Sequence, residues 1–152
     1  MRNIFTLLLL LAAFGGSAQT NRSVLLYGYA RPSHPGIVPA NRKNATLMDY
    51  QVYLARPAGA FRLTEVRIGG KRYDFRSERV TAPVLSVNRN LPEAPRTDTL
   101  VPPTTRIVER IYLPAGPVRP GAGALQVRYT WKGKTYTRVL KNWKELEPIM
   151  NE

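Results

Sequence analysis

Apolar and polar residues alternate in short runs along most of the chain, and clusters of proline and glycine separate these runs. Runs of about four to eight residues rich in β-branched and aromatic side chains, bounded by turn-forming residues, are typical of β-strands. The pattern predicts strands at residues 24–30, 50–55, 63–68, 71–76, 84–87, 106–113, 125–132 and 134–140. Prolines predict long loops at residues 31–46, 88–105 and 114–123, because proline lacks the amide hydrogen that a sheet needs.

Gly69-Gly70 joins two of these runs and predicts a tight hairpin, since two-residue turns with positive φ favour glycine. The turn sets Ile68 opposite Lys71, Val66 opposite Tyr73 and Thr64 opposite Phe75 on a largely apolar face. The opposite face carries charged residues whose sign alternates along diagonals: Glu65, Arg67, Arg72, Asp74 and Arg76.

Lys132-Gly133 predicts a second hairpin for the same reason. The expected cross-strand pairs are Trp131 with Lys134, Tyr129 with Tyr136, Val127 with Arg138, and Leu125 with Leu140. A three-residue loop would set Tyr129 and Trp131 against threonines, so the apolar pattern favours the two-residue register. The residues expected on the opposite, polar face are Arg128, Thr130, Thr135 and Thr137.

The segment 142–147 is open to two interpretations. Asn142 and Glu145 have the spacing of a helix capping box, and Leu140, Trp143 and Leu146 recur every three residues. The same residues fit a final strand equally well. Elsewhere helix signals are scarce, so the predicted fold is all-β: an antiparallel two-sheet sandwich of immunoglobulin-like type, with a small partly open β-barrel as the alternative.

Residues 1–18 have the composition of an export signal. Arg2 precedes an apolar run of about 11 residues, and Gly16-Ser17-Ala18 presents small residues to a signal peptidase. This run is shorter than the roughly 20 residues that a membrane-spanning helix needs, and no later segment is long and apolar enough to span a bilayer. We therefore expect a signal peptide at 1–18, a single domain at 19–152, and a periplasmic or extracellular protein.

The amino-acid composition further narrows the class of protein. The 152 residues include no Cys, which excludes a disulfide framework, a thiol nucleophile and a zinc ribbon. Small eukaryotic extracellular domains are usually rich in disulfides, so an exported chain without cysteine fits a bacterial envelope better.

Several short motifs accompany this pattern: Ala18-Gln19 after the leader, Tyr27-Gly28-Tyr29, Leu100-Val101-Pro102, and Gly-Lys-x-Tyr at both Gly70 and Gly133. In these features the chain resembles small exported proteins of unknown function from Bacteroidota-type bacteria, across most of residues 19–152. The resemblance implies an envelope protein and brings no catalytic residues with it.

Catalytic signatures are weak. His34 is the one histidine and has Ser33 beside it, but a hydrolase triad also needs a positioned carboxylate, and no Gly-x-Ser-x-Gly elbow occurs. Glu65 and Asp74 are expected opposite each other on the first hairpin, where neighbouring arginines would keep both ionised, unlike a general acid. We expect no enzyme, no catalytic residue, no metal site and no cofactor, with a small hydrolase as the remote alternative.

Positive charge is the strongest chemical feature. Lys and Arg number 23 against 10 Asp and Glu, so the formal net charge is +13, and +12 once Arg2 leaves with the leader. Such a surface attracts anions, and guanidinium groups pair well with phosphate and carboxylate. A GC-rich genome would also enrich arginine without any demand on the charge. The candidate anion-binding residues lie on and around the two hairpins: Arg67, Lys71, Arg72, Arg76, Arg128, Lys132 and Lys134.

These observations predict an exported, non-enzymatic binding or interaction module of the bacterial cell envelope, whose partner the sequence does not identify. The partner would be an envelope protein or an anionic envelope polymer. The alternative is a basic domain that docks on anionic lipid headgroups or acidic polysaccharide. We do not expect nucleic acid as a ligand, because the aromatic residues are better explained as the packed side of the sheets.

Overall fold

The computed structural model describes residues 23–34, 47–88, 96–114 and 123–150. These residues form strands, turns and short connections, with no helix. The strands are β1 (Leu25–His34), β2 (Leu47–Arg56), β3 (Phe61–Ile68), β4 (Lys71–Tyr73), β5 (Arg76–Val80), β6 (Val84–Asn88), β7 (Arg96–Val101), β8 (Ile107–Tyr112), β9 (Leu125–Trp131), β10 (Lys134–Leu140), β11 (Lys144–Glu145) and β12 (Ile149–Met150). The expected leader, residues 1–18, lies outside the described ranges.

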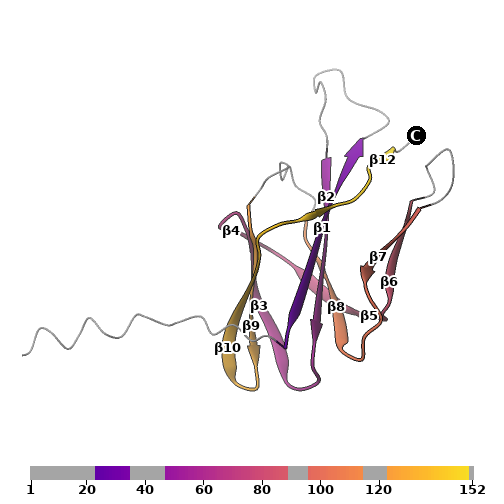
Figure 1. Ribbon diagram of the computed structural model, residues 1–152. Helices are drawn as coiled ribbons and strands as arrows, with labels where there is room; N and C mark the ends of the chain where they lie inside the picture. The colour runs from indigo at the N-terminus through magenta and orange to yellow at the C-terminus, as the bar shows by residue number, and fades with distance from the viewer. Residues whose placement is uncertain (1–22, 35–46, 89–95, 115–122, 151–152) are drawn as a thin grey trace, which may run out of the picture.

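The strands form a sandwich with an additional layer (Figure 1). The central sheet has the order β11-β1-β2-β8-β5, and β12 also pairs with β1. The outer sheet has the order β10-β9-β3-β4 and packs on one face of the central sheet. The β6–β7 hairpin packs on the other face. None of these sheets closes into a barrel, so the predicted sandwich is confirmed and the barrel alternative is wrong.

Alternation along β2 explains the two cores. Val52 and Leu54 point toward the outer sheet and join the first core cluster with Val66, Val127 and Tyr129. Tyr53 and Ala55 point the other way, into a second cluster that contains Leu100, Val101, Val108 and Leu146. Because both faces of β2 are covered, residues 52–55 are all buried and read as a continuous apolar run.

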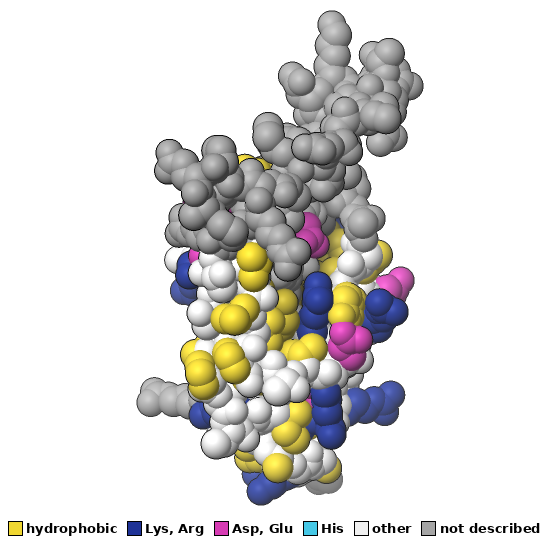
Figure 2. Space-filling model, turned by 90° about the vertical axis from the view of Figure 1, so that its right-hand side faces the viewer, with side chains coloured by type: hydrophobic (Ala, Val, Ile, Leu, Met, Phe, Trp, Pro, Cys, Tyr) yellow, Lys and Arg dark blue, Asp and Glu magenta, His cyan; other side chains and the backbone are white. Residues whose placement is uncertain are grey.

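The β6–β7 hairpin is tied to the central sheet by polar contacts as well as by its apolar residues. The Tyr29 hydroxyl donates to the Leu100 carbonyl, and Arg31 Nη2 donates to Ser86 Oγ at 2.6 Å. Its other face is open, and Leu85 and Val87 are about half exposed (52% and 47%). Apolar side chains gather on the side of the molecule that carries this hairpin (Figure 2).

Both predicted hairpin registers are observed. Ile68 pairs with Lys71 and Val66 with Tyr73 across Gly69-Gly70. The four predicted pairs across Lys132-Gly133 all form. In both turns the backbone has positive φ, including Lys132 at 49°, which is the conformation that a type I′ turn requires. Local turn chemistry therefore sets the geometry of the outer sheet.

Three predictions about strand limits are wrong. β1 continues through Pro32 to His34, where a loop was expected, and its residue Ser33 still pairs with Leu47. Residues 96–101 of the expected 88–105 loop form β7. The predicted strand 71–76 ends at Tyr73, so Thr64 and Phe75 do not pair. Phe75 instead packs against the core between the sheets, and the chain crosses to the central sheet, where β5 pairs with β8.

The helix considered for 142–147 does not form. Lys144 and Glu145 of β11 pair with β1 in parallel, as does β12, and in these two pairings the sheet departs from the antiparallel prediction. In an extended segment Trp143 and Leu146 point to opposite faces. Trp143 packs against the first core cluster and Leu146 is buried in the second, so one segment contributes to both cores.

A buried ion pair lies between the central and outer sheets. Arg56 on β2 donates from Nε and Nη2 to Glu109 Oε1 on β8, at 2.9 and 2.7 Å. The Arg56 guanidinium also stacks over the Phe61 ring, with Cζ 4.5 Å from the ring centroid. Arg56 is only 4% exposed, so the pair is shielded from water.

Replacing Glu109 with glutamine should destabilise the protein strongly. The variant leaves Arg56 buried without a counter-charge, which typically costs about 3–5 kcal/mol. Urea unfolding of Glu109→Gln at neutral pH should show a loss of this size. The double variant Arg56→Met/Glu109→Leu removes both charges and should recover most of it.

The matched control is Glu78→Gln on the exposed strand β5, which should change the unfolding free energy by less than about 0.5 kcal/mol. Equal losses of unfolding free energy from the Glu109 and Glu78 substitutions would contradict an ion pair that is shielded from water.

Candidate arginine face

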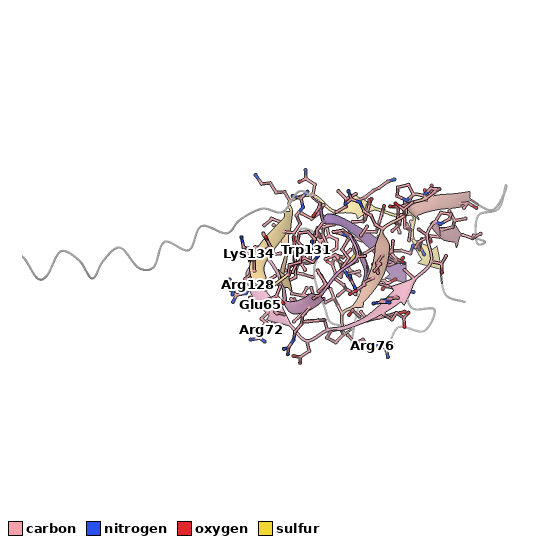
Figure 3. All side chains as sticks on the ribbon, turned by 90° about the horizontal axis from the view of Figure 1, so that it is seen from below. Glu65, Arg72, Arg76, Arg128, Trp131 and Lys134 are labelled. Atoms are coloured by element: carbon pink, nitrogen blue, oxygen red, sulfur yellow. The ribbon has the colours of Figure 1, made fainter. Side chains whose placement is uncertain are left out.

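The solvent side of the outer sheet carries the largest group of sequence-predicted candidates. Register places Glu65 beside Arg128, and Arg128 beside Thr137. The next row runs from Arg72 through Arg67 to Gln126. Seen from below, Lys134, Arg128, Glu65 and Arg72 follow one another across the sheet (Figure 3). We call Arg62, Glu65, Arg67, Arg72 and Arg128 the arginine face.

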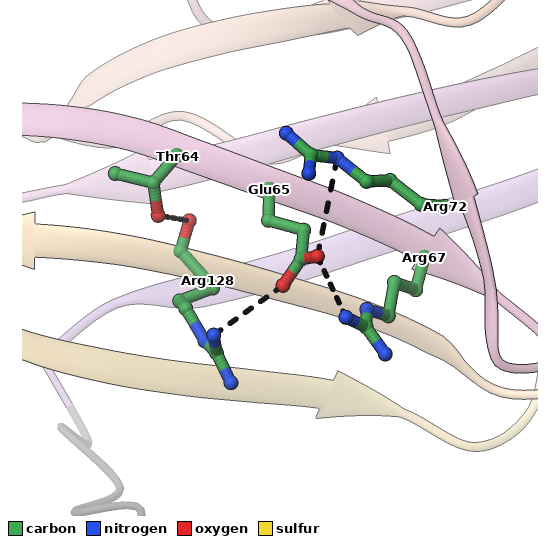
Figure 4. A network of polar contacts seen from close by, with 5 residues as sticks. All are labelled: Thr64, Glu65, Arg67, Arg72 and Arg128. Atoms are coloured by element: carbon green, nitrogen blue, oxygen red, sulfur yellow. Dashed lines mark hydrogen bonds and ion pairs between the residues drawn. The ribbon is translucent and has the colours of Figure 1, made fainter.

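Glu65 is the centre of the arginine face (Figure 4). Arg67 Nη2 donates to Glu65 Oε1 at 2.8 Å, and Arg72 Nε lies 4.0 Å from the same oxygen. Arg128 Nη1 lies 3.6 Å from Oε2. The Glu65 side chain is 12% exposed, whereas the side chains of Arg67, Arg72 and Arg128 are 42–71% exposed. One carboxylate therefore holds three guanidinium groups whose remaining donors can reach solvent.

Electrostatics keep Glu65 ionised. The hydrogen bond from Arg67 has the largest effect and lowers the pKa of the Glu65 carboxyl; burial opposes it, and the charges of Arg67, Arg128 and Arg72 lower the pKa further. The predicted effect of the arginines on Glu65 is thus confirmed. A general acid needs a raised pKa, so Glu65 has the opposite of the property that hydrolysis would require.

The candidate residues separate into groups. Arg67, Arg72 and Arg128 come together around Glu65. Lys71 follows the Gly69-Gly70 turn, with its Nζ 5.6 Å from the centroid of the Tyr73 ring. Lys132 and Lys134 flank the other turn, and because β3 and β9 are antiparallel, this turn lies at the opposite end of the sheet.

Arg76 does not belong with the others. It lies in β5 of the central sheet, with its Cζ 4.6 Å from the centroid of the Tyr112 ring, and Arg110 Cζ lies at the same distance from that ring. Figure 3 shows Arg76 well away from Arg72. The expectation that Arg72 and Arg76 share a face is wrong, because the chain changes sheets between them.

Arg62 is a member of the face that the sequence pattern did not reveal. It pairs with Thr130, which lies two residues from Arg128 on the same side of β9. The register shifts between Leu63 and Glu65, so the alternation of side chains between the two faces of β3 changes at this bulge. Arg62, before the bulge, therefore shares a face with Glu65 and Arg67, after it. Simple alternation counted from Glu65 assigns Arg62 to the wrong side.

The residues considered for hydrolysis do not assemble in the predicted way. Asp74 follows the end of β4 and is not paired opposite Glu65. His34 is the last residue of β1, not part of a loop, and its backbone lies beside Met150. Across the ranges for which coordinates are described, no group of three His, Asp or Glu side chains has the arrangement of a metal site.

Comparisons with known protein families, with curated proteins and with solved structures found no match. Within the described ranges, the structure contains no helix long and apolar enough to cross a bilayer.

Glu65 should stabilise the fold in a pH-dependent way. Its pKa in the folded state is lower than the ordinary value of 4.5, so its contribution is fully present above that value and is lost as the pH falls through the lowered pKa. Urea unfolding of wild type and Glu65→Gln should differ most at neutral pH and converge in acid. The exposed Glu145 offers a control, Glu145→Gln. A wild-type advantage over Glu65→Gln that is equally large in acid would contradict the ion-pair explanation.

Proposed function

We propose that this protein is an exported, non-enzymatic binding module of the bacterial cell envelope, and that the arginine face binds an anionic polymer. The leader-like sequence of residues 1–18 and the absence of cysteine support the location. The observation that carries the ligand class is the convergence of Arg67, Arg72 and Arg128 on one shielded carboxylate.

Glu65 makes this cluster more suitable for binding than a set of scattered arginines. It holds the guanidinium groups of Arg67 and Arg128 in place, so less side-chain freedom is lost when a ligand binds. Each planar group still offers paired N–H donors that match a carboxylate, sulfate or phosphate. Three positive charges against one negative charge leave an excess of two, so an anionic ligand is attracted electrostatically.

The shape of the face favours an extended ligand. Successive outward residues on one strand are about 7 Å apart, so the guanidinium groups are spaced along the strands and across them. Two threonines continue the polar surface onto β10, where the exposed Thr135 pairs with the half-buried Thr130. Hydroxyl groups beside guanidinium groups suit a polymer that carries both hydroxyls and anionic groups, which favours acidic polysaccharide over a lipid surface.

The proposal is tested by removing charge from the face. The double variant Arg72→Gln/Arg128→Gln should bind alginate, a polyuronate, about tenfold more weakly. The slope of log affinity against log salt concentration should also become shallower by about two, because two ionic contacts are lost. Isothermal titration calorimetry over a salt series measures both quantities. The matched control, Arg76→Gln/Arg79→Gln, removes the same charge from β5 of the central sheet and should have a much smaller effect.

Three results would decide against the proposal: no salt-sensitive binding to alginate, equal losses in the two double variants, or equal binding to the neutral polymer dextran. Vesicles of phosphatidylcholine and phosphatidylglycerol form a separate arm. Stronger binding to these vesicles than to alginate would move the assignment from polysaccharide to lipid headgroups.

A further inference from the structure

A second site, independent of the arginine face, lies at the end of the sandwich where β1 ends and β2 begins. Both strands have ten residues, against seven in β9 and β10, so their ends extend beyond the partner sheet (Figure 1). A pocket of about 350 Å³ opens there. Its lining residues are Ala30, Met48, Tyr50, Gly123, Lys141, Asn142, Trp143 and Glu145.

A small residue on β1, Ala30, leaves room for this pocket. Glu145, Ala30 and Tyr50 form one row across β11, β1 and β2, because Ala30 pairs with both of the others. Neighbouring strands are about 4.8 Å apart, so Glu145 and Tyr50 stand roughly 10 Å apart on either side of Ala30. The methyl group of Ala30 fills little of that gap and forms the floor of the pocket.

Trp143 forms a rigid aromatic wall. Its indole Nε1 donates to the Gly123 carbonyl at 3.0 Å. The ring lies over Gly28, where an added Cβ would come within 3.1 Å of two ring carbons. Tyr50 meets Trp143 edge-on, with ring centroids 4.7 Å apart at an angle of 64°. These contacts hold the indole in one orientation before any ligand arrives.

The rim has a balanced polar character. Lys141 supplies donors, Glu145 supplies acceptors, and the Asn142 amide supplies both. These three residues are exposed, and their side chains have no hydrogen bond or ion pair in the part of the chain that the structure describes. Because the charges of Lys141 and Glu145 offset each other, the rim does not select an ion of either sign.

We propose that this pocket binds a neutral pyranose sugar. A pyranose ring has an apolar face of C–H groups, which suits an aromatic wall, and an edge of hydroxyls that both donate and accept hydrogen bonds. The pocket has both features: Trp143 and Tyr50 form an aromatic wall, and the rim carries hydrogen-bond donors and acceptors. Small-molecule sites commonly combine an apolar or aromatic lining with a few polar groups. The volume of the pocket is at the lower end of the range for small-molecule sites, which limits the bound portion to about one or two rings.

The two tryptophans allow a direct test on the purified protein. Methyl β-glucopyranoside, methyl β-galactopyranoside and N-acetylglucosamine are titrated separately while the indole N–H resonances are followed by NMR. At least one sugar should shift the Trp143 resonance saturably. Trp131, in the outer sheet, should not respond and is the internal reference. The open-chain polyol sorbitol should leave both resonances unchanged.

Variants separate sugar binding from a purely structural role of Trp143. Ala30→Val raises the pocket floor without altering the rim and should abolish the shift. Asn142→Ala removes one exposed amide and should weaken binding about tenfold. Ala58→Val, at an exposed turn between β2 and β3, is the matched control and should bind like wild type.

Absence of a saturable Trp143 shift with all three sugars would overturn the proposal. A shift that survives both Ala30→Val and Asn142→Ala, or that sorbitol reproduces, would also overturn it. If Ala30→Val does not fold, the Asn142→Ala titration decides alone. Because the probes are neutral, the outcome is independent of anion binding at the arginine face.

Discussion

Burial of the central sheet on both faces is the constraint on which the rest of the structure depends. Residues 52–55 of β2 alternate between two cores, so neither face of that strand can carry charge without a partner. Glu109 on β8 faces inward, and its negative charge is matched by Arg56. The outer sheet is covered on one face only, and Arg62, Glu65, Arg67, Arg72 and Arg128 lie on the other face.

The two proposed sites are consequences of this layering in different ways. The arginine face exists because the outer sheet has no further layer on its solvent side in the described structure. The pocket exists because β1 and β2 extend beyond the outer sheet and because Ala30 leaves space between its neighbours, while Gly28 lets the Trp143 ring lie against β1. One site is broad and charged, and the other is narrow and aromatic, so they suit different ligands.

The sequence predicted what depends on neighbours along the chain and missed what depends on distant contacts. Both hairpin registers follow from two-residue turns, and the ionised state of Glu65 follows from nearby arginines. The crossing at Phe75 could not be predicted, because it depends on β8 being available as a partner for β5. The three-residue spacing of Trp143 and Leu146 fits a helix in isolation. Only the presence of two cores explains it in a strand.

The placement of Glu65 bears on whether the positive charge is merely compositional. A genome bias would raise the number of arginines without bringing them together, and like charges at adjacent cross-strand positions repel. Here Arg67 and Arg72 are directly paired across two strands, and Arg128 lies on a third. The chain has 10 acidic residues for 23 basic ones, yet one of those acids stands where it offsets this repulsion. Such an arrangement is what selection for a concentrated, preorganised cationic surface would produce, and composition alone would not require it.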